Sequence, residues 1–344
     1  MNKPGKKGLL LINLGTPDSP READVRAYLK EFLMDPCVID TPWVIRWPLV
    51  HGLILRKRPA VSAALYRKIW TERGSPLAFH HQDLADSVQK KLGPQWVVRP
   101  GMRYGKPSIL SAMEDFQRAG IDEVVIFPLY PQYSFAATQS SVLASLKHVK
   151  GVLPGARTRI IPAFFGSPSF IEAFARIAEP ALAEFGPDHL LFSFHGLPQR
   201  QVKKTERNPG CCFSNDACCN EVREENGDCY RAQCFATARS LANRLGWQDS
   251  SRWSVAFQSR LGRTPWIQPY TDFMYEELPA RGIQKLAVMC PSFVADCLET
   301  LEEVQIRGQA QFIRAGGSEL KLIPSLNSSP AWVESVAQMA TEGE

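Results

Sequence analysis

The chain has 344 residues, of which 44% are hydrophobic and 22% are charged, and its formal net charge is +5. This length predicts about two domains rather than one small core, and the composition is ordinary for a soluble globular enzyme. The charge is small and no long basic run occurs. That pattern argues against a nucleic-acid partner but is compatible with an anionic small molecule or a membrane surface.

The first apolar run follows basic residues, in MNKPGKKGLLLINLGTPDSP, and so looks superficially like a secretory signal. The run from Leu9 to Ile12 is too short for such a signal, and a turn follows it instead of a cleavage site. No stretch approaches the roughly 20 apolar residues of a membrane-spanning helix. We therefore expect a cytoplasmic, soluble protein that at most touches the inner membrane peripherally.

Short apolar runs recur along the chain, and each ends in Gly, Pro or polar residues. In order they are GLLLINLGTP, QWVVRPGMRYG, EVVIFPLYPQYS, TRIIPAFFGSP, HLLFSFHGLP, RWSVAFQSRLG, KLAVMCPSF and LKLIPSLN. They are rich in Val, Ile, Leu and Phe without clean alternation, which is typical of buried parallel strands. Helical patterns lie between them, for example at residues 107–120 and 231–246, each ending at a glycine.

This alternation of strands and helices predicts an α/β fold with doubly wound parallel sheets. A boundary near residue 165 gives two domains, 1–165 and 166–344, the second of which ends in a closing helix. Ligands of such folds bind beyond the carboxyl ends of the strands. No strand is followed by GxGxxG or GxxxxGK[ST], so a nucleotide site lacks its main support.

A single histidine, His195, ends the apolar run LLFSFHGLP and is followed by Gly196 and Pro198, which force a turn. This position projects an imidazole from a rigid strand end. Near neutral pH an imidazole can accept protons or ligate a divalent metal. A histidine that is merely hydrogen-bonded at a strand end would have the same pattern, and both interpretations stay open.

The segment CPSFVADCLETLEEVQIRG predicts a helix after the seventh apolar run. On an α-helix Asp296, Glu299 and Glu303 would share the face opposite the apolar positions. They form either a solvated acidic face or a line of carboxylates that attracts a hard cation and carries protons away. A histidine facing a glutamate across a crevice would suit the insertion of a divalent metal.

Six of the nine cysteines lie between Asn208 and Cys234. They are Cys211, Cys212, Cys218, Cys219, Cys229 and Cys234. In a reducing cytosol, clustered thiols bind metal more often than they form disulfides. The spacing fits neither the common zinc pattern nor a ferredoxin run, so an iron–sulfur cluster, zinc and free thiols all remain open.

Several motifs resemble those of the ferrochelatases, and the resemblance extends over essentially the whole chain. The motifs are LLLINLGTPDSP, GMRYGKPSI, FPLYPQYSFAATQSS, LLFSFHGLPQR, VAFQSRLGRTPWIQPYTD and CPSFVADCLETLEE. The family consists of lyases that insert ferrous iron into a porphyrin in the last step of haem synthesis. Its type II chelatase fold has two Rossmann-like halves with a porphyrin cleft between them.

By this resemblance His195 is the active-site histidine, Glu299 is the essential glutamate, and both handle the iron substrate. Asp296 and Glu303 take the acidic relay positions. The residues that match porphyrin-contacting positions are Leu14, Arg103, Tyr104, Tyr133 and Phe293. Many relatives have Asp-His-x-Glu where this chain has Cys297 in place of the histidine, so one proposed relay group is missing.

The resemblance also bears on cofactor, substrate and surface. Some bacterial members carry a [2Fe–2S] cluster, which would use four of the six clustered cysteines at residues 208–234. Residues 47–70 match an apolar lip over the cleft, which suits a planar ligand with propionates and transient membrane contact, or is an ordinary amphipathic helix. Protoporphyrin IX is the expected substrate. The alternatives are coproporphyrin, another type II chelatase inserting cobalt or nickel, and a non-catalytic Fe–S or haem-binding regulator.

Overall fold

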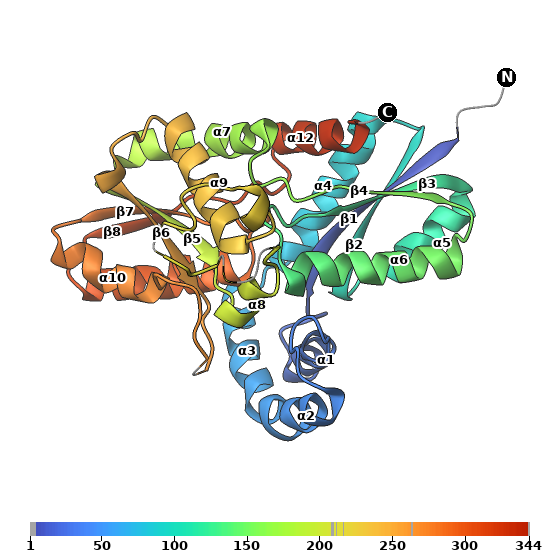
Figure 1. Ribbon diagram of the computed structural model, residues 1–344, viewed down its shortest axis with the longest axis horizontal. Helices are drawn as coiled ribbons and strands as arrows, with labels where there is room; N and C mark the ends of the chain where they lie inside the picture. Colours follow the sequence, from blue (N-terminus) through green and yellow to red (C-terminus); the bar gives the residue numbers. More distant parts are fainter. Residues whose placement is uncertain (1–4, 208–209, 211, 216, 263, 343–344) are drawn as a thin grey trace. The chain divides into compact units, whose positions relative to one another are not determined.

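The computed structural model describes residues 5–207, 210, 212–215, 217–262 and 264–342, and these residues form two parallel sheets. The first sheet has the order β2 (Trp96–Gly105), β1 (Lys6–Thr16), β3 (Ile121–Pro128), β4 (Arg157–Ile160). The second has the order β6 (Trp253–Gln258), β5 (His189–His195), β7 (Lys285–Met289), β8 (Glu319–Leu322). Every strand pair is parallel, so the predicted α/β class is confirmed (Figure 1).

The chain divides into two compact units, one around each sheet. The first contains the chain up to Tyr130, Phe135–Pro162 and the segment from Ser328 onward, and the second contains Pro131–Ser134 and Ala163–Asn327. The closing helix therefore belongs to the first unit, whereas the sequence places it in the second domain.

The closing helix, α12 (Pro330–Thr341), packs on α4 (Pro76–Leu92) of the first unit. The Lys91 ammonium lies 2.5 Å from the Glu334 carboxylate, and Trp332 is completely buried. These contacts explain why sequence order is a poor guide to the domain of this helix.

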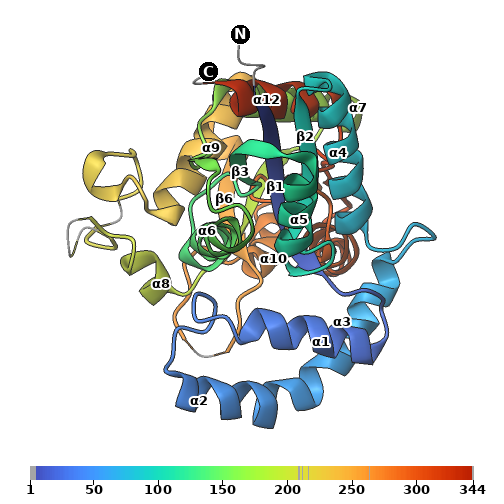
Figure 2. The same ribbon diagram turned by 90° about the vertical axis from the view of Figure 1, so that its right-hand side faces the viewer.

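In the first unit the two central strands of the sheet, β1 and β3, each contain a run of buried apolar residues. The helices of this unit are α1 (Glu22–Leu33), α2 (Trp43–Pro48), η1 (Leu49–Ile54), α3 (Leu55–Ile69), α4, α5 (Ile109–Ala119), η2 (Phe135–Gln139) and α6 (Ser140–Val152). On α5 the predicted apolar face, including Met113 and Phe116, is buried, and Gly120 ends the helix in the left-handed conformation. Figure 2 shows α1, α2 and α3 grouped together beyond one end of β1.

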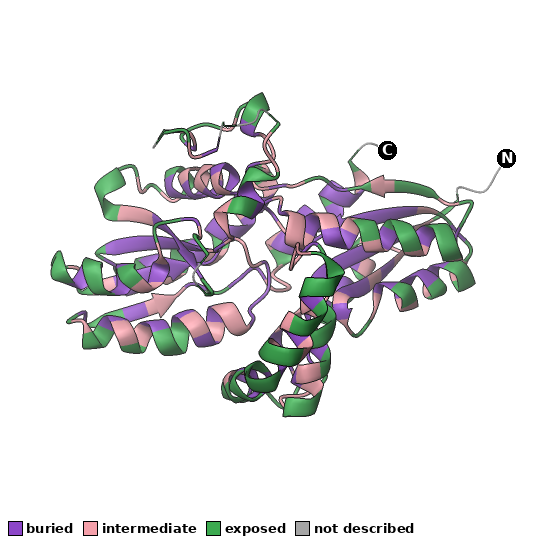
Figure 3. Ribbon diagram, turned by 60° about the horizontal axis from the view of Figure 1, so that its bottom comes forward, coloured by how far each residue is buried: buried purple, intermediate pink, exposed green. Residues whose placement is uncertain are grey.

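In the second unit the elements after β5 and β7 carry the residues of interest. The helices are α7 (Pro168–Phe185), α8 (Gln199–Lys203), η3 (Glu224–Asn226), α9 (Tyr230–Arg244), η4 (Ser250–Arg252), α10 (Thr271–Ala280), η5 (Glu299–Gly308) and α11 (Gln309–Arg314). Buried side chains such as Leu191, Val288 and Phe312 form its core. In Figure 3 the strands of this unit are largely buried.

The helix expected from residue 290 begins later than the sequence predicts. Residues 291–297 form turns and irregular backbone, and η5, a π-helix, starts at Glu299. Asp296 therefore lies outside the helix, and the predicted acidic face contains only two of its three members. No helix among the described residues has the length and apolar character needed to cross a bilayer.

Candidate active site

His195 is the last residue of β5, where its backbone is fixed from two sides. Its N–H donates to the Ser292 hydroxyl at 3.1 Å, and the Tyr230 hydroxyl donates to its carbonyl at 2.8 Å. The ring Nδ1 lies 2.6 Å from the Gly196 carbonyl, which can only accept, so Nδ1 carries the hydrogen. In the neutral ring Nε2 then holds the lone pair and is the atom that can take up a proton or bind a metal.

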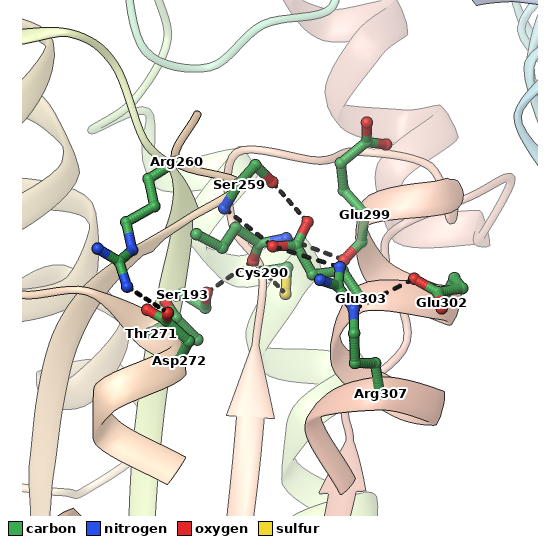
Figure 4. Close-up of polar contacts among 11 residues, drawn as sticks. Ser193, Ser259, Arg260, Thr271, Asp272, Cys290, Glu299, Glu302, Glu303 and Arg307 are labelled. Carbon is green, nitrogen blue, oxygen red and sulfur yellow. Dashed lines mark hydrogen bonds and ion pairs between the residues drawn. The ribbon is translucent and has the colours of Figure 1, made fainter. Parts of the chain in front are cut away.

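Glu303 is the second acidic group of the site, one turn into η5. The main-chain N–H of Ser259 donates to one of its carboxylate oxygens at 2.9 Å, and the Ser259 hydroxyl donates to the other at 2.5 Å (Figure 4). Ser259 directly follows β6 and has a φ of 67°, a left-handed conformation that is strained for a serine. This conformation aims both of its donors at the same carboxylate.

The pKa of Glu303 is raised above its ordinary value, chiefly because the carboxyl group is buried. Ser259 and Arg307 oppose this shift, but the Arg307 guanidinium is half-exposed and 3.7 Å from the carboxylate. The charge of Glu299 raises the pKa further, whereas His195 acts to lower it. The charges of His195 and Glu299, the two residues that the sequence predicts to be catalytic, therefore both affect the pKa of Glu303.

Glu299 opens η5 and is only half-buried. Its main-chain carbonyl accepts a hydrogen bond of 2.9 Å from the buried Gln258 amide, which fixes the start of the helix. In Figure 4 its carboxylate extends away from the Ser259–Glu303 pair. The thiol of Cys297, where many relatives have histidine, is in hydrogen-bonding contact with the Glu299 carboxyl group, and burial raises the pKa of this thiol well above its usual range.

Asp296 has a different environment from the two glutamates. Its buried carboxylate accepts hydrogen bonds from the Thr300 hydroxyl at 3.1 Å, the Ser325 N–H at 3.2 Å and the Asn327 amide at 2.8 Å. These contacts join the start of η5 to the loop after β8. The relay role of Asp296 stays a prediction.

The sequence-predicted residues fall into two sets, one in each unit. His195, Phe293, Asp296, Glu299 and Glu303 share the second unit, and the Phe293 ring lies edge-on to His195 with 6.2 Å between ring centres. Tyr133 also belongs to this unit, whereas Leu14, Arg103 and Tyr104 belong to the first.

In the first unit Arg103 and Tyr104 surround a carboxylate that sequence reasoning does not single out. The Arg103 guanidinium forms an ion pair with Asp35, and the completely buried Tyr104 donates to the same carboxylate at 2.8 Å. The Ser140 hydroxyl donates to it at 2.6 Å. Burial acts to raise the pKa of Asp35, but these donors, the Cys37 N–H and the Arg103 charge outweigh it, so the pKa is lowered.

Sequence reasoning also assigns no role to Gln258, Ser259, Ser292 or Tyr230. Gln258 ends β6, Ser259 follows it and Ser292 comes after β7, so polar residues at that edge of the second sheet were the available signal. Tyr230 follows no strand, and its contact with His195 joins residues 35 positions apart. No local pattern reveals such a pair.

Four of the clustered cysteines are buried close to one another at the start of α9. Cys211 lies outside the described residues, and Cys218 is half-buried. The buried thiols are those of Cys212, Cys219, Cys229 and Cys234. A hydrogen bond with Cys212 is the main reason that the pKa of Cys229 is raised to about 11, and Cys229 also contacts Cys219.

Two arginines and one glutamate contact these cysteines, and the Glu206 carboxylate accepts from the Cys212 N–H at 2.9 Å. The Arg231 guanidinium donates to the Cys219 sulfur at 3.1 Å, and Arg239 donates to the Cys219 carbonyl. Within the described ranges, no three Cys, His, Asp or Glu side chains are arranged as ligands of one metal ion. A [2Fe–2S] cluster needs a different arrangement, since its four thiolates are shared between two irons. A group of paired, buried thiols beside an arginine is compatible with that requirement.

Exposed apolar side chains gather on α2 and η1 of the first unit, and we call them the apolar lip. They are Trp43, Val44, Ile45, Trp47 and Leu53, with exposed fractions of 47% to 70%. The next helix, α3, continues with the exposed basic run at residues 56–58. In Figure 3 most of this segment is exposed.

Comparison with known proteins gives one family. The family model named Ferrochelatase matches residues 6–344. The ferrochelatase of Coxiella burnetii (strain CbuK_Q154) is 48% identical over 335 residues, which cover 97% of this chain and 93% of the relative. That of Bdellovibrio bacteriovorus is 47% identical, with 97% and 98% covered.

Two solved structures share the fold at low sequence identity. SirB from Bacillus subtilis, solved with Fe3+, is 12% identical with a TM-score of 0.51, covering 98% of this chain and 96% of its own. A multi-domain protein from Deinococcus radiodurans, described as structurally similar to chelatases, is 14% identical with a TM-score of 0.52, covering 99% of this chain and 56% of its own. Both likenesses concern the fold alone.

Proposed function

The chain belongs to the ferrochelatase family, the lyases that insert ferrous iron into a porphyrin in haem synthesis, and we propose that His195, Glu299 and Glu303 carry out this insertion. The observation that supports these roles is that one imidazole and two carboxyl groups act electrostatically on one another at the carboxyl end of the second sheet.

Metal insertion has a simple proton balance. A free porphyrin holds two pyrrole N–H protons, and both leave as Fe2+ takes their place. His195 presents Nε2 as the free acceptor, because its Nδ1–H is held by the Gly196 carbonyl. We assign the first acceptance of a pyrrole proton to this nitrogen.

The second acceptor in the proposal is the Glu303 carboxyl group. Its raised pKa and its two hydrogen bonds from Ser259 suit a group that takes up a proton and releases it again. Glu299 is half-buried, and its charge raises the pKa of Glu303. We assign to Glu299 the guidance of Fe2+, for which a charged carboxylate is a suitable ligand.

The test is anaerobic incubation of the purified protein with Fe2+ and porphyrin, followed by absorbance. We expect His195→Ala to slow insertion at least about 100-fold, as for the loss of a general base. The control is His148→Ala, which removes a half-buried histidine from α6 of the first unit and should leave the rate unchanged. Near-normal insertion by a folded His195→Ala protein would refute the assignment.

We propose protoporphyrin IX as the porphyrin. The apolar lip supports this choice, because protoporphyrin carries fewer carboxylates than coproporphyrin. The same assay with each porphyrin decides the matter: a higher kcat/KM for coproporphyrin would reverse the choice.

We also propose that Cys212, Cys219, Cys229 and Cys234 hold a [2Fe–2S] cluster. Their burial supports this choice over Cys218, which is half-buried although its sulfur lies 3.6 Å from that of Cys219. The contacts of Cys229 with Cys212 and Cys219, and the Arg231 charge, support a shared site. When bound, such a cluster supplies a cross-link between the cysteine segment and α9, and a one-electron redox centre.

The cluster proposal is tested by visible absorption and by iron and sulfide analysis after anaerobic purification. Cys219→Ser should lose the absorption, whereas Cys218→Ser should keep it. Zinc in place of iron, or a colourless metal-free protein, would refute the cluster.

Finally, we propose that the apolar lip makes peripheral contact with anionic membranes. Its tryptophans and the basic run on α3 support this, since apolar insertion and charge attraction add in such binding. The double variant Trp43→Ser/Trp47→Ser should bind anionic phospholipid vesicles about tenfold more weakly, and Leu143→Ser, at an exposed position on α6, should not. Equal binding by both variants would refute the contact.

A further inference from the structure

Tyr230 joins two parts of the second unit that the sequence treats as separate. It is the first residue of α9, directly after Cys229, and it is buried. Its hydroxyl donates to the His195 carbonyl at 2.8 Å. The same hydroxyl is in hydrogen-bonding contact with the Cys234 sulfur and with Ser292. One side chain thus contacts both the active-site histidine and the cysteine set.

The Tyr230 contact helps to hold the main chain of His195. His195 ends its strand, and the Gly196 N–H after it donates to the Gln258 carbonyl at 2.8 Å. Its N–H is held by Ser292 and its carbonyl by Tyr230. Removal of either bond leaves the residue less firmly held, and a small displacement of a proton acceptor costs rate even when the substrate still binds.

The position of Tyr230 depends in turn on the segment before α9. Between α8 and α9 the short η3 is the only regular element that the described residues form. The side chain of Asn226 braces this segment by donating to the carbonyls of Cys218 at 3.0 Å and Glu221 at 2.9 Å. A segment with so little regular structure opens locally at low cost, and a group bound by its thiols would prevent that opening.

We infer that Tyr230 is a positioning residue through which a metal group on the cysteine set holds His195 in its working place. The inference rests on the proposed roles of His195 and of the four thiols. With metal bound, the start of α9 is fixed and the Tyr230–His195 hydrogen bond persists. Without metal, this end of the helix loosens, the bond is made for less of the time, and iron insertion slows.

The experiment compares the protein with and without its cysteine-bound metal. Metal is removed anaerobically with a chelator, and the chelator is removed by gel filtration before the insertion assay. We expect metal removal to lower kcat about threefold to tenfold with KM unchanged, as for the loss of one uncharged hydrogen bond made around the acceptor. With metal bound, Tyr230→Phe should already have the lowered kcat of the metal-free unaltered protein. Removal of the metal from this variant should not lower its kcat further.

The matched control is Tyr275→Phe, since the Tyr275 hydroxyl is buried without a hydrogen-bond partner. This variant should respond to metal removal as the unaltered protein does. Because coupling is reciprocal, Tyr230→Phe should bind the metal up to about tenfold more weakly, and it is therefore loaded in excess iron and sulfide. Iron content and visible absorption verify that loading.

A second measurement requires no enzymatic turnover and is made on the unaltered protein, so it does not depend on the folding of any variant. The imidazole nitrogen resonances of His195 in the unaltered protein should shift when the metal is removed. The inference is overturned if the His195 resonances do not move or if metal removal leaves kcat unchanged. It is also overturned if metal removal lowers the kcat of Tyr230→Phe as much as that of the unaltered protein, or if Tyr230→Phe cannot be loaded with the metal. An iron-free protein after anaerobic isolation would overturn it too. Failure of the proposed role of His195 is seen separately, in a normal rate for His195→Ala.

Discussion

Each unit buries a carboxylate near the carboxyl end of its sheet, and the two are treated in opposite ways. Asp35 of the first unit faces the Arg103 guanidinium and two hydroxyl donors, and its pKa is lowered. Glu303 of the second unit has Ser259 as its close donor, and its pKa is raised. Burial opposes the charged form in both cases, so the difference comes from the partners.

This difference separates a fixed charge from a mobile proton. A carboxylate paired with a partly buried arginine has its ionised form favoured, and the pair helps to hold the fold around it. A carboxyl group with a raised pKa and an exposed arginine at 3.7 Å takes up a proton more readily than an ordinary carboxylate. This contrast supports the proposal that the first unit contributes a fixed charge and that the second unit carries out the acid–base chemistry of iron insertion.

The largest effect is expected from Glu303→Gln. The amide keeps the shape but cannot take up a proton, so iron insertion should fall by about 10³-fold, within the range for a lost acid–base group. Stability should not fall, because a neutral amide is less costly to bury than a carboxylate. The assay is anaerobic Fe2+ insertion together with thermal unfolding.

The matched control for that variant is Glu302→Gln. Glu302 is adjacent and fully buried, but Figure 4 shows its side chain directed away from Ser259. We expect less than about a threefold change in rate, below the effect of a typical lost hydrogen bond. Similar losses in both variants would remove the distinction between the two glutamates.

The next effect concerns the fold of the first unit. Asp35→Asn leaves the Arg103 guanidinium without its counter-charge, and we expect a loss of about 2–3 kcal/mol in unfolding free energy. Asp83→Asn is the comparison, because Asp83 pairs with Arg73 at 2.7 Å and the Arg73 side chain is 58% exposed. That variant should lose no more than about 0.5 kcal/mol in a urea titration. Equal losses would mean that burial does not determine how much each ion pair contributes to the free energy of unfolding.

The sequence predicts the strands that position the two carboxyl groups, but not the residues with which these groups interact. Continuous apolar runs such as HLLFSFH identify the strands, and the histidine at the end of that run is correctly placed at the end of β5. The pairs that set the pKa values join residues 44 and 68 positions apart, Ser259 with Glu303 and Asp35 with Arg103. No periodicity encodes such pairs, because they depend on how strands order in the sheet.

The acidic helix shows a second limit. Apolar spacing in LETLEEVQIRG is compatible with an α-helix, and nothing in it indicates the i→i+5 bonds of η5. The start of the helix is also concealed, since Asp296 accepts hydrogen bonds from the loop after β8 as well as from Thr300 of the helix. Local propensity is a weak guide where tertiary hydrogen bonds decide the backbone.

A smaller effect is expected from Ser259, and two substitutions separate its roles. Ser259→Ala and Ser259→Gly both remove the hydroxyl that donates to Glu303, and both should lower kcat about tenfold, as for a hydrogen bond to a charged group. Glycine adopts the φ of 67° without strain, so Ser259→Gly should be more stable than Ser259→Ala by about 1 kcal/mol. Equal stabilities would show that the backbone at this position relaxes.

The smallest effect is a pair of opposite pH dependences. The raised pKa means that folded Glu303 keeps a proton which the unfolded chain has released above its ordinary value of 4.5. The stability of the unaltered protein relative to Glu303→Gln should therefore fall as pH rises above that value.

The lowered pKa of Asp35 gives a pH dependence of stability with the reverse sign. The stabilising contribution of Asp35 is present above the ordinary value of 3.8 and is lost as pH falls below it. Relative to Asp35→Asn, the unaltered protein should therefore gain stability as pH rises through that lower range. Urea unfolding of the three proteins across the acid range measures both slopes, and two slopes of the same sign would contradict the contrast between a fixed charge and a mobile proton.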